Sequence, residues 1–232
     1  MIKVRSAAER GKTQTSWLDS NHTFSFNRYY DPEWSGFRDL LVINEDFVAP
    51  SAGFGTHSHR DMEILSYVVS GQLAHKDSTG TSSVIKPGDL QRMSAGTGVS
   101  HSEFNPSQTE PTHFLQIWIM PDREALTPEY EEHTFSEIEG RGRLRLIGSR
   151  DGSAGSVTIH QDVKVYDGSL NAGEEISYQL GINRHAWIQV IKGSITTHGT
   201  VLRISDGAAI GEENHLSIQA IQDAKILFFD LS

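Results

Sequence analysis

Short apolar segments rich in valine, isoleucine and phenylalanine recur along the chain, and turn-forming residues separate them. Their regular spacing is typical of strands in an all-β sandwich or barrel. No segment shows the long 3.6-residue periodicity of an amphipathic helix. The clearest apolar segments are DLLVINEDFV (39–48), EILSYVVSG (63–71), SSVIKPGDL (82–90), THFLQIWIMP (112–121), AWIQVIKGSI (186–195) and AKILFFDL (224–231). The pattern therefore predicts an all-β fold.

A polar segment separates the two halves of the chain. Residues 121–143, PDREALTPEYEEHTFSEIEGRGR, are rich in Pro, Glu and Gly, which fits an exposed connector better than a core strand. The 232 residues are sufficient for two domains of about 100 residues each. We expect an N-terminal domain over 1–130 and a C-terminal domain over 131–232.

The two halves also resemble one another faintly. AGFGTHSHRDMEILSYVVSG (52–71) can be aligned with AGEEISYQLGINRHAWIQVIKGS (172–194). Further along the chain, residues 84–90 align with 201–208, and residues 113–119 align with 225–231, in the same order. Although the identities are few, the alignment predicts two β-barrels of similar topology.

Charge, cysteine content and the lack of long apolar runs argue against several classes of protein. The formal net charge is −10, which argues against broad binding to a nucleic-acid backbone. The chain has no cysteine, its first residues contain no apolar stretch of signal-peptide length, and no apolar run approaches the ~18 residues of a membrane span. These features favour the cytoplasm, with no membrane partner.

Two pairs of metal-binding side chains repeat one spacing on two predicted strands. His57 and His59 form the first pair, and His101 and Glu103 form the second. Side chains at positions i and i+2 share one face of a strand, so each pair can direct two donors at one point. Two such strands facing each other across a barrel would supply four ligands.

The residue types suit a divalent transition metal. Imidazole nitrogens and a carboxylate oxygen bind such ions at about 2.0–2.2 Å. Four protein ligands leave open positions on an octahedral ion such as Fe(II), where a substrate and O2 could bind. The alternative is that the four residues are polar surface residues of unrelated strands, but their spacing, the flanking glycines and a nearby PGD turn favour the metal site.

Other histidines and aromatic residues have more ordinary interpretations. The histidines without a comparable partner are expected to be surface or hydrogen-bonded residues, and they are His22, His75, His113, His133 and His160. The aromatic and apolar residues near the proposed site could line a pocket for a flat substrate or fill the barrel core, and they are Phe47, Phe54, Trp118 and Met120. Strand alternation directs only half of such residues inward, and the sequence does not decide which half.

The segments around both pairs resemble the two signature motifs of the cupin superfamily. They are HSHRDME (57–63) with the later Gly71, and PGD (87–89) followed by HSEFN (101–105). The combination of His-x-His in the first motif with His-x-Glu in the second is similar to the pirin family. Two flanking segments strengthen the match, FNRYYDPEWSGFRDLLVINEDFVAP (26–50) and SAGTGVSHSEFN (94–105). The resemblance is closest to the bacterial pirin-like proteins described as quercetin 2,3-dioxygenases.

The resemblance implies a bicupin, with two tandem β-barrel, jelly-roll-like domains, and one divalent metal per chain. The metal is expected to be Fe(II), with Ni, Co, Mn, Cu, Zn or Cd as substitutes. In pirins the carboxylate ligand comes from the second motif, so Glu103 is expected and Glu63 takes second place. In the C-terminal domain the internal alignment puts Ser177 and Gln179 where the first histidine pair stands. That domain is therefore expected to bind no metal.

Two functions follow from the resemblance. The first is a metal-dependent dioxygenase that cleaves the heterocyclic ring of flavonols such as quercetin with O2 and releases carbon monoxide, with Glu103 accepting the proton of the 3-hydroxyl. The second is a metal-dependent, redox-sensing regulatory protein that acts through a protein partner. A deep, apolar, open-ended cavity at the metal would favour the enzyme, whereas a closed site with a charged surface patch would favour partner binding. A sugar isomerase or sugar-binding cupin would require more polar and charged pocket residues. We also expect a monomer that does not bind nucleic acid directly.

Overall fold

The structure, a computed structural model, describes the backbone of all 232 residues and every side chain except those of Glu137 and Glu139. Strands dominate this backbone, and its helices are the short 3-10 segments Ala7–Glu9, Glu137–Gly140 and Ser153–Gly155. Among the described residues, no helix has the length and apolar character needed to cross a membrane. The all-β prediction is confirmed.

The residues form two compact units, each built from two antiparallel sheets. The first unit comprises Gly11–Phe135 and Val157–Gln161, and the second comprises Met1–Arg10, Ser136–Ser156 and Asp162–Ser232. Each unit is a jelly-roll-like sandwich of a larger and a smaller sheet, as expected for a bicupin, and neither is a closed barrel. The domain bounds expected from the sequence stay a prediction.

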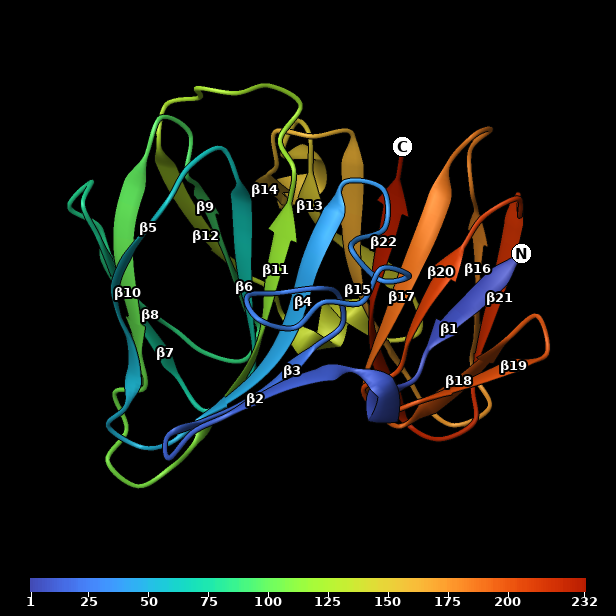
Figure 1. Cartoon of the computed structure of the whole chain (residues 1–232). Helices are drawn as coiled ribbons and strands as arrows, with labels where there is room; N and C mark the ends of the chain where they lie inside the picture. Colours follow the sequence, from blue (N-terminus) through green and yellow to red (C-terminus); the bar gives the residue numbers. More distant parts are fainter. The chain divides into compact units, whose positions relative to one another are not determined.

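The strands of the first unit are β2 (Gly11–Gln14), β3 (Leu18–His22), β4 (Leu40–Val48), β5 (Gly53–His59), β6 (Glu63–Ser70), β7 (Leu73–Asp77), β8 (Ser82–Ile85), β9 (Asp89–Ser94), β10 (Val99–Phe104), β11 (Thr112–Ile119), β12 (Glu129–Thr134) and β14 (Val157–Thr158). The larger sheet has the order β12-β9-β6-β11-β4-β3-β2, and the smaller has the order β5-β10-β7-β8 (Figure 1). The smaller sheet carries both predicted donor pairs.

The strands of the second unit are β1 (Ile2–Arg5), β13 (Leu144–Ser149), β15 (Val163–Leu170), β16 (Glu175–Gln179), β17 (His185–Lys192), β18 (Ser194–Thr197), β19 (Thr200–Arg203), β20 (Gly207–Ile210), β21 (His215–Ala220) and β22 (Ala224–Leu231). The larger sheet contains the order β1-β20-β17-β22-β15-β13, and the smaller has the order β16-β21-β18-β19. Figure 1 shows β1, in blue, beside β20, and Ile2 lies opposite Ile210.

Strand order in the two units supports the internal alignment. Strands β9-β6-β11-β4 of the first unit correspond to β20-β17-β22-β15 of the second, and β5-β10-β7-β8 correspond to β16-β21-β18-β19. In the second unit β1 lies beside β20, as β12 lies beside β9 in the first unit. The N-terminal strand therefore completes the sheet formed by the C-terminal half.

Three expected segments differ in detail from the observed ones. Residues 82–90 and 186–195 each contain two strands, because a turn with a positive-φ glycine, Gly88 or Gly193, interrupts the apolar run. The expected connector 121–143 contains β12, which pairs with β9 at the edge of the sheet. Its side chains are mostly exposed or half-buried, which explains why its composition resembles a loop.

Candidate metal centre and pocket

Strands β5 and β10 bring the two predicted donor pairs together. They are antiparallel neighbours in the smaller sheet, with His57 opposite His101. A register shift between His101 and Glu103 marks a β-bulge, a feature that re-aims side chains near functional sites. The ring centroids of His57, His59 and His101 lie 4.5, 4.7 and 4.9 Å apart. One nitrogen from each ring can thus face a common point.

The ring nitrogens are arranged as a metal site requires. His57 Nδ1 donates to the carbonyl of Gly55 at 2.8 Å, which leaves the lone pair on its Nε2. His57 Nε2 lies 3.1 Å from His101 Nε2. Two nitrogens bound at right angles to one ion, each at about 2.1 Å, would be about 3 Å apart. His59 Nε2 is buried and has no hydrogen-bond partner among the described side chains. The three imidazoles therefore fit a divalent transition metal.

A second histidine and an aspartate support His101 from behind. His101 Nδ1 lies 3.5 Å from His75 Nδ1, and His75 Nε2 donates to Asp77 Oδ2 at 2.9 Å. With its Nε2 proton on Asp77, His75 can accept a long hydrogen bond from His101 Nδ1–H, which directs the Nε2 lone pair of His101 towards the other histidines. Metal-ligating histidines usually have such partners. The pairing was missed in the sequence, although His75 and Asp77 repeat the i, i+2 spacing.

Burial keeps two of the imidazoles neutral. It lowers the pKa of His59 to about 4, and the neighbouring His57 adds to the effect. It also lowers the pKa of His101 to about 3, again with a contribution from the nearby histidines. The neutral imidazole nitrogen is the form that binds a metal, so both groups are ready for coordination at pH 7.

Glu103 lies in a second, overlapping group of donors. Its carboxylate and the nitrogens of His75 and His101 form a buried group, so that His101 belongs to both groups. Glu103 Oε1 accepts a hydrogen bond from Ser66 at 3.0 Å, and Oε2 accepts one from Gln116 at 2.6 Å. A carboxylate has about four lone-pair sites, so these two bonds leave room for a metal.

Glu63, the second choice for the carboxylate ligand, lies on the other sheet of the first unit. It begins β6, where it pairs with Ser94 across to β9. Both of its oxygens lie 3.3 Å from Nδ1 of His160, and the backbone N–H of His160 also donates to it. Glu63 is absent from the metal-binding groups found among the described side chains.

A glycine allows the close approach of β5 and β10. A Cβ atom on Gly53 would lie 2.3 Å from the carbonyl oxygen of Glu103 and 2.6 Å from Cα of Phe104. We expect Gly53→Ala to force the strands apart, to destabilise the protein by about 1–3 kcal/mol and to weaken metal binding. Thermal melting and metal titration measure both effects.

Gly55→Ala is the matched control for this prediction, because a Cβ at Gly55 would meet no atom within 4 Å. Its melting temperature and metal affinity should stay close to those of the wild type. Equal behaviour of the Gly53→Ala protein and the wild type would contradict the proposed role of the close approach.

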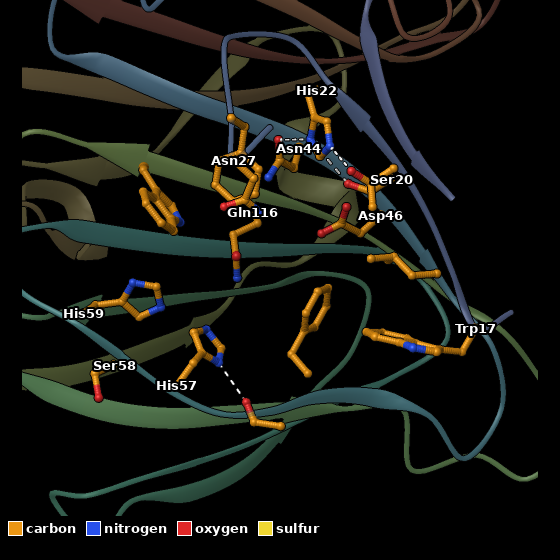
Figure 2. A pocket seen from close by; sticks show the side chains of 16 residues that line it. Trp17, Ser20, His22, Asn27, Asn44, Asp46, His57, Ser58, His59 and Gln116 are labelled. Carbon is orange, nitrogen blue, oxygen red and sulfur yellow. Dashed lines mark hydrogen bonds between the residues drawn. The ribbon is translucent and has the colours of Figure 1, made fainter. Parts of the chain in front are cut away.

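A pocket of about 530 Å³ opens beside His57 and His59 (Figure 2). This volume lies within the range of about 300–1,000 Å³ that is typical of ligand sites. Its aromatic walls come from Trp17, Phe26, Phe54 and Trp118. Phe54 and Trp118 thus line a pocket, one of the two roles expected for them. Phe47 instead stacks on His113 with a centroid distance of 4.1 Å, and Met120 is 41% exposed.

One wall of the pocket is more polar than the sequence indicated. Figure 2 shows Ser20, His22, Asn44 and Asp46 on the side away from His57 and His59. His22 Nδ1 donates to Asn44 Oδ1 at 2.8 Å. Burial raises the pKa of Asp46 to about 7, a hydrogen bond from Ser20 opposes the shift, and the nearby carboxyls add to it. The signal for this wall was the polar run Asn44-Glu45-Asp46 in an otherwise apolar strand, in which Asn44 and Asp46 share one face.

The remaining histidines are hydrogen-bonded or exposed. His113 Nε2 lies 3.0 Å from Glu45 Oε1, and His160 contacts Glu63 as described. The side chain of His133 is 41% exposed, with Nε2 3.4 Å from a carboxylate oxygen of Glu131. His22 is hydrogen-bonded as expected, and its contribution to the pocket was not predicted.

The second unit has neutral side chains where the first has its donor pairs. Ser177 takes the position aligned with His57, and Ser217 lies opposite it, as His101 lies opposite His57. Gln179 takes the position aligned with His59. Both metal-binding groups found among the described side chains belong to the first unit. That the second unit binds no metal stays a prediction, and the strand register supports it.

Family models match both halves of the chain. The model described as Pirin matches residues 3–119, slightly more than half of the chain. The chain belongs to the pirin family. A second model, described as quercetinase C-terminal cupin domain, matches residues 146–231 of this pirin. The resemblance seen in the two histidine motifs is therefore confirmed.

This pirin is similar to curated and solved proteins over its whole length. It is 48% identical over 231 residues to a quercetin 2,3-dioxygenase of Escherichia coli O157:H7, covering 100% of this chain and 99% of the relative. A putative quercetin 2,3-dioxygenase of Pasteurella multocida is 41% identical, with 100% of both chains covered. The crystal structure of the bacterial pirin YhhW from Escherichia coli in complex with nickel(II) has a TM-score of 0.95 and 47% identity, covering 100% of this chain and 99% of that one.

Proposed function

We propose that this pirin is a metal-dependent dioxygenase that cleaves a flavonol, such as quercetin, with O2 and releases carbon monoxide. The observation that carries the proposal is the convergence of three imidazoles, two of which line an aromatic-walled pocket of about 530 Å³. An open cavity beside the metal favours an enzyme over a regulatory protein. The names of the similar proteins described above support the same substrate class.

In this proposal His57, His59, His101 and Glu103 hold one divalent ion. When bound, the ion would stabilise the deprotonated 3-hydroxyl of the substrate and leave positions for substrate and O2. We propose Fe(II) as the native metal, while the nickel complex of a relative supports a divalent ion more generally. The residues lining the pocket would hold the flat ring system and exclude water.

Glu103 is the proposed acceptor of the substrate proton. Gln116 and Ser66 hold its two carboxylate oxygens in place, and both donors come from the opposite sheet of the first unit. A carboxylate within hydrogen-bond distance of a hydroxyl can act as a general base. Because a ligated carboxylate is a weaker base than a free one, Glu103 must either turn away from the metal or share the proton.

The proposal is tested by stoichiometry. Protein loaded with Fe(II) should consume O2 and release carbon monoxide in equal amounts when quercetin is added. Flavone, which lacks the 3-hydroxyl, should give neither. Metal-free protein should be inactive, and the same free metal without protein sets the background rate. A reaction no faster with protein than with free metal would refute the dioxygenase proposal.

Oligomeric state and location complete the proposal. We propose a cytoplasmic monomer that does not bind nucleic acid directly, in keeping with the net charge of −10.

A further inference from the structure

Asp46 has an unusual position in the pocket. Its side chain is 2% exposed and lines the cavity. Oδ1 is buried and makes no hydrogen bond to any described group, while Ser20 donates a hydrogen bond to the carboxyl. A buried polar atom without a partner costs about 1–3 kcal/mol, so an unsatisfied carboxylate oxygen on a residue that lines a cavity indicates a ligand contact.

The row of side chains across the sheet makes this carboxyl stand out. Asp46 on β4 lies opposite Ser20 on β3 and Phe114 on β11, and Phe114 lies opposite Val68 on β6. The next row towards the metal is polar and includes Gln116, whose amide is used to hold Glu103. In that row Gln116 and Ser66 hold Glu103, whereas Asp46 is a carboxyl in a row that continues through the apolar residues Phe114 and Val68.

We propose that Asp46 forms a recognition subsite for a second hydroxyl group of the substrate, on the side of the pocket away from the metal. The inference rests on the proposed function, because it assumes an aromatic ligand whose first hydroxyl faces the metal. It narrows the substrate class to planar aromatic compounds with a further phenolic hydroxyl. Ser20, the partner of Asp46, holds the carboxyl by a hydrogen bond, so Oδ1 is the oxygen left to accept one from the ligand.

The surroundings favour a hydroxyl over a cation. Asp46 belongs to none of the metal-binding groups of three or more donors found among the described side chains. The other groups on this wall, Ser20, His22 and Asn44, offer hydrogen bonds and no further carboxylate. Four aromatic rings complete the pocket and match a flat ligand. A phenolic O–H can donate to Oδ1 in this setting, with a charge-assisted bond when the carboxyl is ionised.

The test compares two ligands that differ in their hydroxyl groups. Quercetin carries additional phenolic hydroxyls, whereas 3-hydroxyflavone carries only the one that would face the metal. Binding to protein loaded with Ni(II) is measured without O2, so that no turnover occurs. Quenching of tryptophan fluorescence reports binding, because Trp17 and Trp118 line the pocket.

Loss of the carboxyl should affect the two ligands differently. Asp46→Ala should weaken quercetin binding by about 10-fold to 100-fold and leave 3-hydroxyflavone binding unchanged. Asp46→Asn retains a neutral acceptor, so its quercetin affinity should fall between those of the wild type and Asp46→Ala. Asp46→Asn also carries the test if Asp46→Ala does not fold.

Glu45→Gln is the matched control. Glu45 is the preceding residue of the same strand, is equally buried, and faces His113 on the other side of the sheet. Loss of the Glu45 carboxylate should leave the preference for quercetin over 3-hydroxyflavone unchanged. Equal losses for both ligands in the Asp46 variants, no loss for either, or no binding of quercetin to the wild type would each overturn the inference. Oxygen uptake by the wild type in air is a separate measurement. If quercetin binding depends on Asp46 but the wild type shows no turnover, the dioxygenase proposal is refuted and the subsite is retained.

Discussion

Replacement of His101 by alanine is expected to abolish metal binding. His101 belongs to both donor groups, since its nitrogens lie near His57 on one side and near His75 and Glu103 on the other. Loss of a supporting residue costs a metal site about 10–100-fold in affinity, and loss of a ligand shared by both groups should cost at least about 100-fold. Metal content after dialysis should fall from one equivalent per chain to background.

His133→Ala is the control for this experiment. His133 lies on an exposed edge strand, and its contact with Glu131 is outside both donor groups. This variant should retain one equivalent of metal. One full equivalent with unchanged affinity in the His101→Ala protein would show either that the ligand assignment is wrong or that the second unit holds the ion.

Replacement of Glu103 by glutamine is expected to reduce flavonol turnover by about 100-fold or more at saturating metal. Glutamine has nearly the same shape but cannot accept the substrate proton. Its amide group would also face one of the donors, Ser66 or Gln116, which now bind the two carboxylate oxygens. Steady-state kinetics on samples of matched metal content measure the effect, and loss of the base should lower kcat more than it changes KM.

Glu63→Gln is the control, because it makes the same chemical change at another buried carboxyl. Glu63 lies on the other sheet of the first unit, where His160 contacts it. Its kcat should remain near the wild-type value if the protein folds normally. Equal turnover of Glu103→Gln and wild type would remove Glu103 from proton transfer. A loss confined to Glu63→Gln would instead favour the second choice for the carboxylate.

The donor pairs could be predicted from the sequence because strand geometry is local. A spacing of two residues places His57 and His59 on one face regardless of the rest of the fold. The internal alignment likewise located the neutral positions Ser177 and Gln179, because equivalent strands recur in the same order. Such inferences need only the period of a strand and the order of the segments.

Features that depend on register between distant strands were not predictable in this way. Asp46 reaches the pocket because β4 directs its even-numbered residues inward, and a one-residue change of register would reverse this. The contact between His75 and His101 requires β7 and β10 to be neighbours. Strand β1 is only four residues long, and its partner lies near the other end of the chain.

The position of β1 has a consequence for the order in which the protein assembles. The ribosome releases Ile2 well before its partner Ile210, which follows about 10 to 40 s later at usual synthesis rates. All strands of the first unit precede residue 162, so the sandwich with the histidine cluster can form while the second is still being synthesised. Strand β1 is therefore synthesised long before its native partner and is among the last strands to be paired.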